Sequence, residues 1–156
     1  MNCRAIHISW LRKSALQRRH EVHTDKLLVV QAPVTDQRLP TRRILQERGE
    51  LALIEDGPEF NHLACFTLLP GPGYFRGGHI HRSKTEHFYV LRGRGVLLWT
   101  DPAAGARGRT EVGAGDKVTI LPGLGHRFEA LEELVVVEYY QGVHDPADDS
   151  VFNDFS

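Results

Sequence analysis

The stretch Gly73-Tyr-Phe-Arg-Gly-Gly-His79-Ile-His81-Arg-Ser-Lys-Thr-Glu86-His-Phe-Tyr-Val-Leu-Arg-Gly93 carries most of the information in this sequence. His79 and His81 are two residues apart, and on a β-strand this spacing places both imidazoles on the same face. The residues between His81 and Glu86 include several polar side chains that suit a turn. A short loop can therefore bring the Glu86 carboxylate back towards the two rings.

A second stretch, Gly115-Asp-Lys-Val-Thr-Ile-Leu-Pro122-Gly123-Leu-Gly-His126, reads as a strand, a Pro-Gly turn and a histidine. Three neutral imidazoles and one carboxylate form a suitable ligand set for a divalent first-row metal. Iron(II), manganese, zinc, nickel and copper all fit such donors. A six-coordinate metal would leave two positions open for water, oxygen or a chelating substrate, whereas tetrahedral zinc would give a closed, structural site.

The segments around these motifs are short, and Gly and Pro punctuate them. Each is long enough for a strand and too short for a typical helix, so the spacing predicts an all-β sandwich or barrel. The expected strands are Leu63–Leu69, Thr85–Leu91, Gly95–Thr100, Lys117–Leu121 and Leu134–Tyr140. The sequence Asp101-Pro-Ala-Ala-Gly105 predicts a hairpin loop between Gly95–Thr100 and Arg107–Val112.

Taken together, the two motifs resemble those of the cupin superfamily. The first motif matches without a gap at Gly73, His79, His81, Glu86 and Gly93, and the second is similar at Gly115, Gly123 and His126. Leu121 stands where the second motif usually has a proline, and Pro122 follows it. The resemblance covers about residues 61–140. It implies a single jelly-roll β-barrel with a metal inside, held by His79, His81, Glu86 and His126; iron, manganese, zinc and nickel are the candidates.

The resemblance also suggests a division of the chain. We expect an N-terminal extension over residues 1–50, the barrel over 51–142 and an acidic tail over 143–156. The extension is expected to contain a strand at Leu27–Ala32, and Thr41 is a plausible N-cap for a short helix over Arg42–Arg48 ended by Gly49. Many single-domain cupins exchange or pack N-terminal strands, so the resemblance implies a homodimer, with the extension as an interface arm.

Composition excludes several classes of function. The 156 residues contain 19 Lys and Arg against 20 Asp and Glu, so the overall charge of −1 gives no basic footprint for nucleic acid. The first 20 residues hold five basic side chains and no acid, and we interpret them as a solvated arm rather than a nucleic-acid-binding one. No apolar run suits a membrane helix or a secretory signal, and two cysteines cannot form a disulfide framework. We therefore expect a cytoplasmic protein.

Side chains near the expected metal site are candidates for other roles. Glu138, Tyr139 or Tyr140 could supply a general acid or base, although strand alternation does not say which of them faces the pocket. Arg76, Arg82 and Lys84 flank the histidine strand and could bind an anionic substrate, or could be solvated loop charges. If Glu86 points inward, then Phe88 and Val90 point inward too and His87 points to the other face.

The stretch from Phe60 through Gly93 and the tail from Val143 also resemble cupins of bacterial cell-surface sugar biosynthesis and of sugar-phosphate isomerisation. This resemblance implies a metal-dependent isomerase or epimerase with a small-molecule substrate, an anionic sugar. Two alternatives remain open, because fold does not decide function. One is an iron(II)-dependent dioxygenase of a small molecule, and the other is a non-catalytic ligand-binding or sensing cupin.

Overall fold

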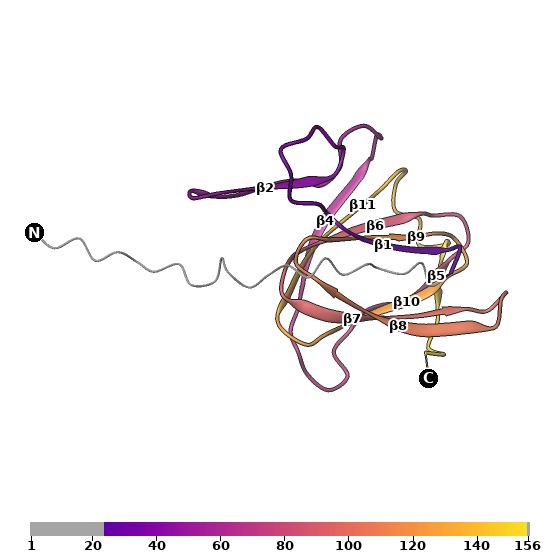
Figure 1. Cartoon of the computed structure of the whole chain (residues 1–156). Coiled ribbons are helices and arrows are strands. Elements are labelled where there is room, and N and C mark those ends of the chain that lie inside the picture. The colour runs from indigo at the N-terminus through magenta and orange to yellow at the C-terminus, as the bar shows by residue number, and fades with distance from the viewer. Residues whose placement is uncertain (1–23, 156) are drawn as a thin grey trace, which may run out of the picture.

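The computed structural model describes residues 24–155, which form twelve strands and, within that range, no helix. Ten of the strands form two five-stranded sheets that face each other, and the remaining two form a separate hairpin (Figure 1). In spatial order, the first sheet contains β1 (Leu27–Gln31), β9 (Asp116–Ile120), β6 (Glu86–Arg92), β11 (Leu134–Tyr140) and β4 (His62–Leu68). The second contains β12 (Asp149–Val151), β5 (Arg76–His81), β10 (Gly125–Ala130), β7 (Arg94–Asp101) and β8 (Ala106–Gly113).

Every ladder in the two sheets is antiparallel. Strands far apart in sequence are neighbours in space, as when β5 lies between β12 and β10. The predicted all-β jelly roll is confirmed. The predicted hairpin is confirmed as well, because β7 pairs with β8 and Asp101 faces Ala106 across the turn. Asp101 also accepts a hydrogen bond from the Ala103 amide at 3.1 Å, which closes that turn.

The hydrophobic core lies between the two sheets. Strand alternation supplies it, since one face of each strand turns inward while the other meets solvent or the hairpin. From the first sheet come Phe88, Val90, Leu134 and Val136, and from the second Leu97, Trp99 and Phe128, all of them buried. The expected inward positions of Phe88 and Val90 are confirmed.

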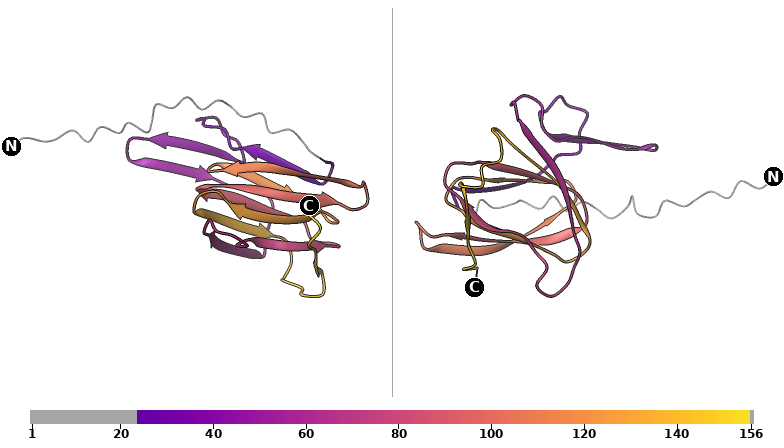
Figure 2. Two further views of the ribbon diagram at one scale, coloured as in Figure 1. Left: turned by 90° about the horizontal axis from the view of Figure 1, so that it is seen from below. Right: turned by 180° about the vertical axis from the view of Figure 1, so that it is seen from behind.

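The prediction of a short helix over Arg42–Arg48 is wrong. These residues form β2 (Arg42–Gln46), which pairs with β3 (Gly49–Leu53) in a hairpin that projects from the barrel (Figures 1 and 2). Thr41 does not cap a helix, because its hydroxyl donates to the Ile54 carbonyl at 3.0 Å. Arg43 forms a paired contact with Glu50 across the hairpin, at 2.6 and 2.9 Å. Seven residues are also too few to offset the cost of starting an isolated helix.

Segments at both ends of the described chain supply edge strands to the barrel. Leu27–Gln31, which lies within the expected N-terminal extension, is β1 and pairs with β9. Asp149–Val151, which lies within the expected acidic tail, is β12 and pairs with β5. The basic first 20 residues lie outside the described residues. Among residues 24–155, no helix is long and apolar enough to cross a membrane.

Candidate metal centre

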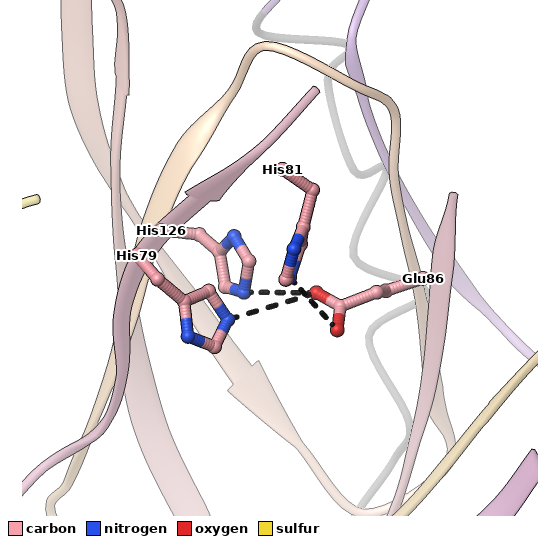
Figure 3. Close-up of side chains that lie close together, drawn as sticks. All are labelled: His79, His81, Glu86 and His126. Carbon is pink, nitrogen blue, oxygen red and sulfur yellow. Dashed lines mark ion pairs between the residues drawn. The ribbon is translucent and has the colours of Figure 1, made fainter. Parts of the chain in front are cut away.

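Four side chains from three strands converge inside the barrel (Figure 3). His79 and His81 come from β5, Glu86 from the start of β6 and His126 from β10. The β5–β10 ladder places His126 directly opposite His79. One potential ligand atom from each residue lies within 4.8 Å of the other three. This upper limit on the ligand–ligand distances is close to the roughly 4.2 Å between two ligand atoms on opposite sides of one ion.

Glycines shape the strand that carries the first two histidines. Gly77 adopts a φ of +86°, and a Cβ there would lie 2.8 Å from the His126 carbonyl oxygen and 3.4 Å from the His126 ring. Only glycine adopts this backbone conformation readily, and only glycine leaves space for such a close approach. The glycine-rich approach to His79 therefore lets β5 and β10 lie close enough to bring their histidines together.

The Glu86 carboxylate lies close to all three histidines of the cluster. Its side chain is 2% exposed, and its oxygens lie 3.1 Å from His81 Nε2, 3.1 Å from His126 Nε2 and 4.0 Å from His79 Nε2. Burial raises the pKa of Glu86, but the neighbouring His126 and His81 outweigh burial and hold this pKa well below its usual range. Glu86 is therefore an anion at neutral pH, as a carboxylate ligand must be.

The imidazoles also suit metal binding. Burial, followed by the nearby His126, lowers the pKa of His79 to about 4, so that ring is neutral at pH 7 with a free lone pair. His126 Nδ1 lies 3.4 Å from the Leu124 carbonyl oxygen. A carbonyl only accepts, so this contact favours the proton on Nδ1 and leaves the lone pair on Nε2, the nitrogen nearest to Glu86.

Three side-chain atoms of the cluster residues are buried without a hydrogen-bond partner: His81 Nδ1, His81 Nε2 and Glu86 Oε2. His81 Nε2 and Glu86 Oε2 lie close to polar atoms of other cluster residues, but not at hydrogen-bonding angles. Buried polar atoms without partners are uncommon and costly. Atoms that are near one another yet not aimed at one another fit a shared partner between them. The three imidazoles, the carboxylate and their unpartnered buried atoms therefore fit a divalent cation.

The cluster opens into a cavity of about 560 Å³. His79, Glu86 and His126 are among the residues that line it. The apolar walls are Phe66, Phe88 and Phe128, whose rings contact one another at centroid distances of 5.0 to 6.4 Å. Arg76 and Glu138 are the charged side chains of the remaining wall.

The structure separates the three acid or base candidates on β11. Glu138 faces the cavity, next to His62 at 3.8 Å, and its pKa is raised by burial and by Glu86. Tyr139 faces the outside of the sheet, where its hydroxyl donates to Glu55 at 3.0 Å and its ring stacks on His87. Tyr140 does not line this cavity, and its ring stacks on His62 at 4.1 Å.

The three basic candidates are separated in the same way. Arg76 lines the cavity, with its guanidinium 5.9 Å from the centre of the Phe66 ring. Arg82 donates to the Ala147 carbonyl at 2.6 Å and so holds the C-terminal segment. Lys84 does not line this cavity, and its Nζ lies 3.1 Å from Glu86 Oε1.

Sequence reasoning missed His62, Glu55 and the two C-terminal acids Asp148 and Asp149. His62 has no ligand-like spacing, and Glu55 reaches Tyr139 from a loop 84 residues away. Asp149 Oδ1 lies 2.9 Å from His81 Nδ1, a contact that depends on the pairing of β12 with β5. No local pattern in the sequence marks such long-range pairs.

No protein-family model matches the sequence, and no curated protein matches it. Solved structures do resemble it. A double mutant of the QdtA 3,4-ketoisomerase from Thermoanaerobacterium thermosaccharolyticum, in complex with TDP, superimposes with a TM-score of 0.65 at 15% identity, over 85% of this chain and 91% of that one. The dTDP-4-dehydrorhamnose 3,5-epimerase from Sulfolobus tokodaii gives a TM-score of 0.68 at 16% identity, over 86% and 81%.

The capsular polysaccharide assembling protein CapF from Staphylococcus aureus is also similar. Its TM-score is 0.54 at 23% identity, and the match covers 76% of this chain and 34% of that one. At these identities the similarity shows a shared fold.

Proposed function

We propose that this chain, which has the cupin fold, is a metal-dependent isomerase or epimerase acting on a nucleotide sugar or a sugar phosphate. One observation carries the proposal: three of the four residues in the cluster of His79, His81, Glu86 and His126 line a cavity, and Glu138 and Arg76 line the same cavity. The structural neighbours support the substrate class, since their names describe sugar 3,4-ketoisomerases and a 3,5-epimerase.

In this proposal the three histidines and Glu86 hold one divalent ion: iron, manganese, zinc or nickel. When bound, such an ion acts as a Lewis acid that polarises a carbonyl oxygen. The orphaned Nε2 of His81 and Oε2 of Glu86 would gain a partner.

Glu138 is the proposed general base. Moving a carbonyl along a sugar requires removal of a proton from the adjacent hydroxyl-bearing carbon and addition of a proton to the former carbonyl carbon. At the same time the hydroxyl of that adjacent carbon loses its proton to become the new carbonyl, and the original carbonyl oxygen gains one. Glu138 faces the cavity, and its raised pKa brings its proton affinity closer to that of a base working near neutral pH. His62, 3.8 Å away, is placed to exchange the proton with solvent because its side chain is 29% exposed.

Arg76 and the aromatic wall complete the proposed site. Arg76 is the basic side chain among the cavity residues, and a guanidinium binds phosphate oxygens in paired hydrogen bonds. Phe66, Phe88 and Phe128 give the cavity an apolar lining that excludes water from the reacting carbons.

The function is tested by incubating the metal-loaded protein with a panel of keto nucleotide sugars and aldose and ketose phosphates, under argon. We expect isomer formation that does not require oxygen and stops on chelation. Consumption of oxygen with a chelating substrate would instead indicate an iron(II) dioxygenase. Absence of turnover across the panel, with metal bound, would favour a non-catalytic binding role.

The role of Glu138 gives a pH-dependent prediction. A base must be deprotonated, so the rate is expected to fall as the pH drops through the pKa of Glu138, which lies above the ordinary value of 4.5. Glu138→Gln should lower kcat by roughly 10²- to 10⁴-fold. Glu132→Gln, at an exposed position outside the cavity, is the matched control. If the Glu138→Gln variant stays active and its rate still falls at low pH as in the natural protein, Glu138 is not the general base.

We also propose that the protein is a homodimer. Edge strand β1 presents Leu28 and Val30 to solvent, and next to them lies a groove of about 400 Å³ that Pro33 and Leu39 also line. The projecting hairpin exposes Leu45 and Leu51. An exposed edge strand can pair with another chain, and exposed apolar patches mark interaction sites. A second copy offers both a matching edge and an apolar hairpin.

Charging the edge strand should separate the subunits. Leu28→Glu combined with Val30→Glu is expected to convert a dimer into a monomer in sedimentation equilibrium, because two carboxylates would be buried at the interface. Leu131→Glu, at an exposed position away from β1, should leave the dimer intact. A monomeric natural protein, or a dimer unaffected by the double substitution, would contradict this proposal.

A further inference from the structure

The C-terminal strand β12 lies against the strand that carries two of the candidate metal ligands. Asp149 pairs with His81 and Val151 pairs with His79 in the β12–β5 ladder, and the Phe152 amide donates to the Gly78 carbonyl at 2.9 Å. The segment is thus fixed along β5, and each of its side chains has a defined position relative to the cluster.

The two consecutive acids of this segment are placed differently. The Asp148 carboxylate accepts from the amides of Arg82, Ser83 and Lys84 and from the Ser83 hydroxyl, at 3.0 to 3.2 Å. These four donors fix the loop between β5 and β6. Asp148 also lies 3.7 Å from His81 Nδ1, but its oxygens are already engaged with the loop.

Asp149 is the acid with free acceptor capacity beside His81. Its Oδ1 lies 2.9 Å from His81 Nδ1, and neither atom has a completed hydrogen bond, although both are buried. His81 is 2% exposed, so no water can replace this partner at low cost. A small rotation of the ring or of the carboxylate would complete the bond.

We infer that Asp149 is a positioning residue for His81. It holds the His81 ring with its proton on Nδ1 and with the Nε2 lone pair directed at the proposed metal site. A neutral imidazole carries one proton, and an ionised carboxylate only accepts, so a bond to Asp149 places that proton on Nδ1. The other nitrogen, 3.1 Å from Glu86, then carries the lone pair that a metal requires. This inference rests on the proposed metal site and assigns to the C-terminal segment a part in building it.

Lys84 connects the two sides of this arrangement. Its Nζ lies 3.1 Å from Glu86 Oε1 and 3.7 Å from Asp149 Oδ1. The Lys84 ammonium therefore lies near both the Glu86 carboxylate and the Asp149 carboxylate. Its positive charge offsets the electrostatic repulsion between these two anions.

The test compares Asp149→Ala and Asp149→Asn with the natural protein in two measurements. Competition with a chelator gives the dissociation constant for Co²⁺. We expect it to rise by roughly 10- to 100-fold in Asp149→Ala, the usual cost of losing such a partner. Asp149→Asn should recover most of the affinity, because its amide oxygen still accepts from Nδ1. Asp145→Asn, in the exposed part of the same segment, should not change it.

The second measurement reads the His81 tautomer in the metal-free protein from imidazole nitrogen shifts in NMR. The proton is expected on Nδ1 in the natural protein and on Nε2, next to the Glu86 carboxylate, in Asp149→Ala. Unchanged Co²⁺ affinity in a folded Asp149→Ala variant, or a proton on Nε2 in the natural protein, would overturn the role of Asp149. A natural protein that carries the His81 proton on Nδ1 but does not bind Co²⁺ would instead overturn the metal site. The orienting role of Asp149 towards His81 would then still hold.

Discussion

Replacing Glu86 with glutamine is expected to abolish the thermal stabilisation that a bound divalent metal gives this protein. At a free metal concentration about 1,000 times the dissociation constant, binding to the folded state alone stabilises it by roughly 4 kcal/mol. For a domain of about 150 residues this raises the Tm by roughly 10 °C. Glutamine has nearly the shape of glutamate but lacks the anionic oxygens that lie 3.1 Å from His81 and His126.

Differential scanning calorimetry tests this prediction. It measures the Tm of the metal-free protein before and after addition of Mn²⁺, Zn²⁺ or Ni²⁺. The natural protein and the exposed Glu132→Gln control should both show the rise in Tm, while Glu86→Gln should show almost none. Circular dichroism of the metal-free variant checks that it is folded. A Glu86→Gln variant that gains the same Tm as the natural protein would show that the carboxylate is not a ligand.

Replacing Phe128 with alanine should cost about 3–5 kcal/mol in the free energy of unfolding. Phe128 is 1% exposed, and its ring packs against Phe66 at 6.1 Å and Phe88 at 5.0 Å. Alanine would enlarge the cavity that Phe128 already lines, next to the cluster of His79, Glu86 and His126. Since domains of this kind are stable by only about 5–15 kcal/mol, the loss is a large fraction of the total.

Urea denaturation of the metal-free protein measures this loss without the contribution of metal. Phe128→Leu is the matched control, because it retains most of the buried volume and should cost less. Equal stability of the alanine variant and the natural protein would mean that the aromatic cluster around Phe128 contributes little to the fold.

The parts of the fold set by local sequence could be predicted. Alternation along β6 was enough to place Glu86 and Phe88 on one face and His87 on the other, because a strand repeats every two residues. The spacing of His79, His81 and Glu86 fixed a strand, a turn and a second strand. The sequence could not choose the inner face of β11, since both faces are largely apolar; the structure turns Leu134, Val136 and Glu138 inward.

The errors and omissions arose where distant segments decide the structure. Gly49 is the first residue of β3 and pairs with Gln46 across a two-residue turn, but a glycine after an Arg-rich segment also resembles a helix stop. What distinguishes the two is the pairing of Arg43 with Glu50, which sequence spacing alone does not reveal. Asp149 contacts His81 only because β12 returns to the edge of β5, and no local pattern predicts that return.

Elemental analysis shows whether His79, His81, Glu86 and His126 hold one divalent ion. The purified natural protein and Glu86→Gln are loaded with an excess of metal, freed of unbound ions by gel filtration and measured by mass spectrometry. We expect about one ion per chain in the natural protein and close to none in the variant. A natural protein that retains no metal, or a variant that retains as much, would contradict it.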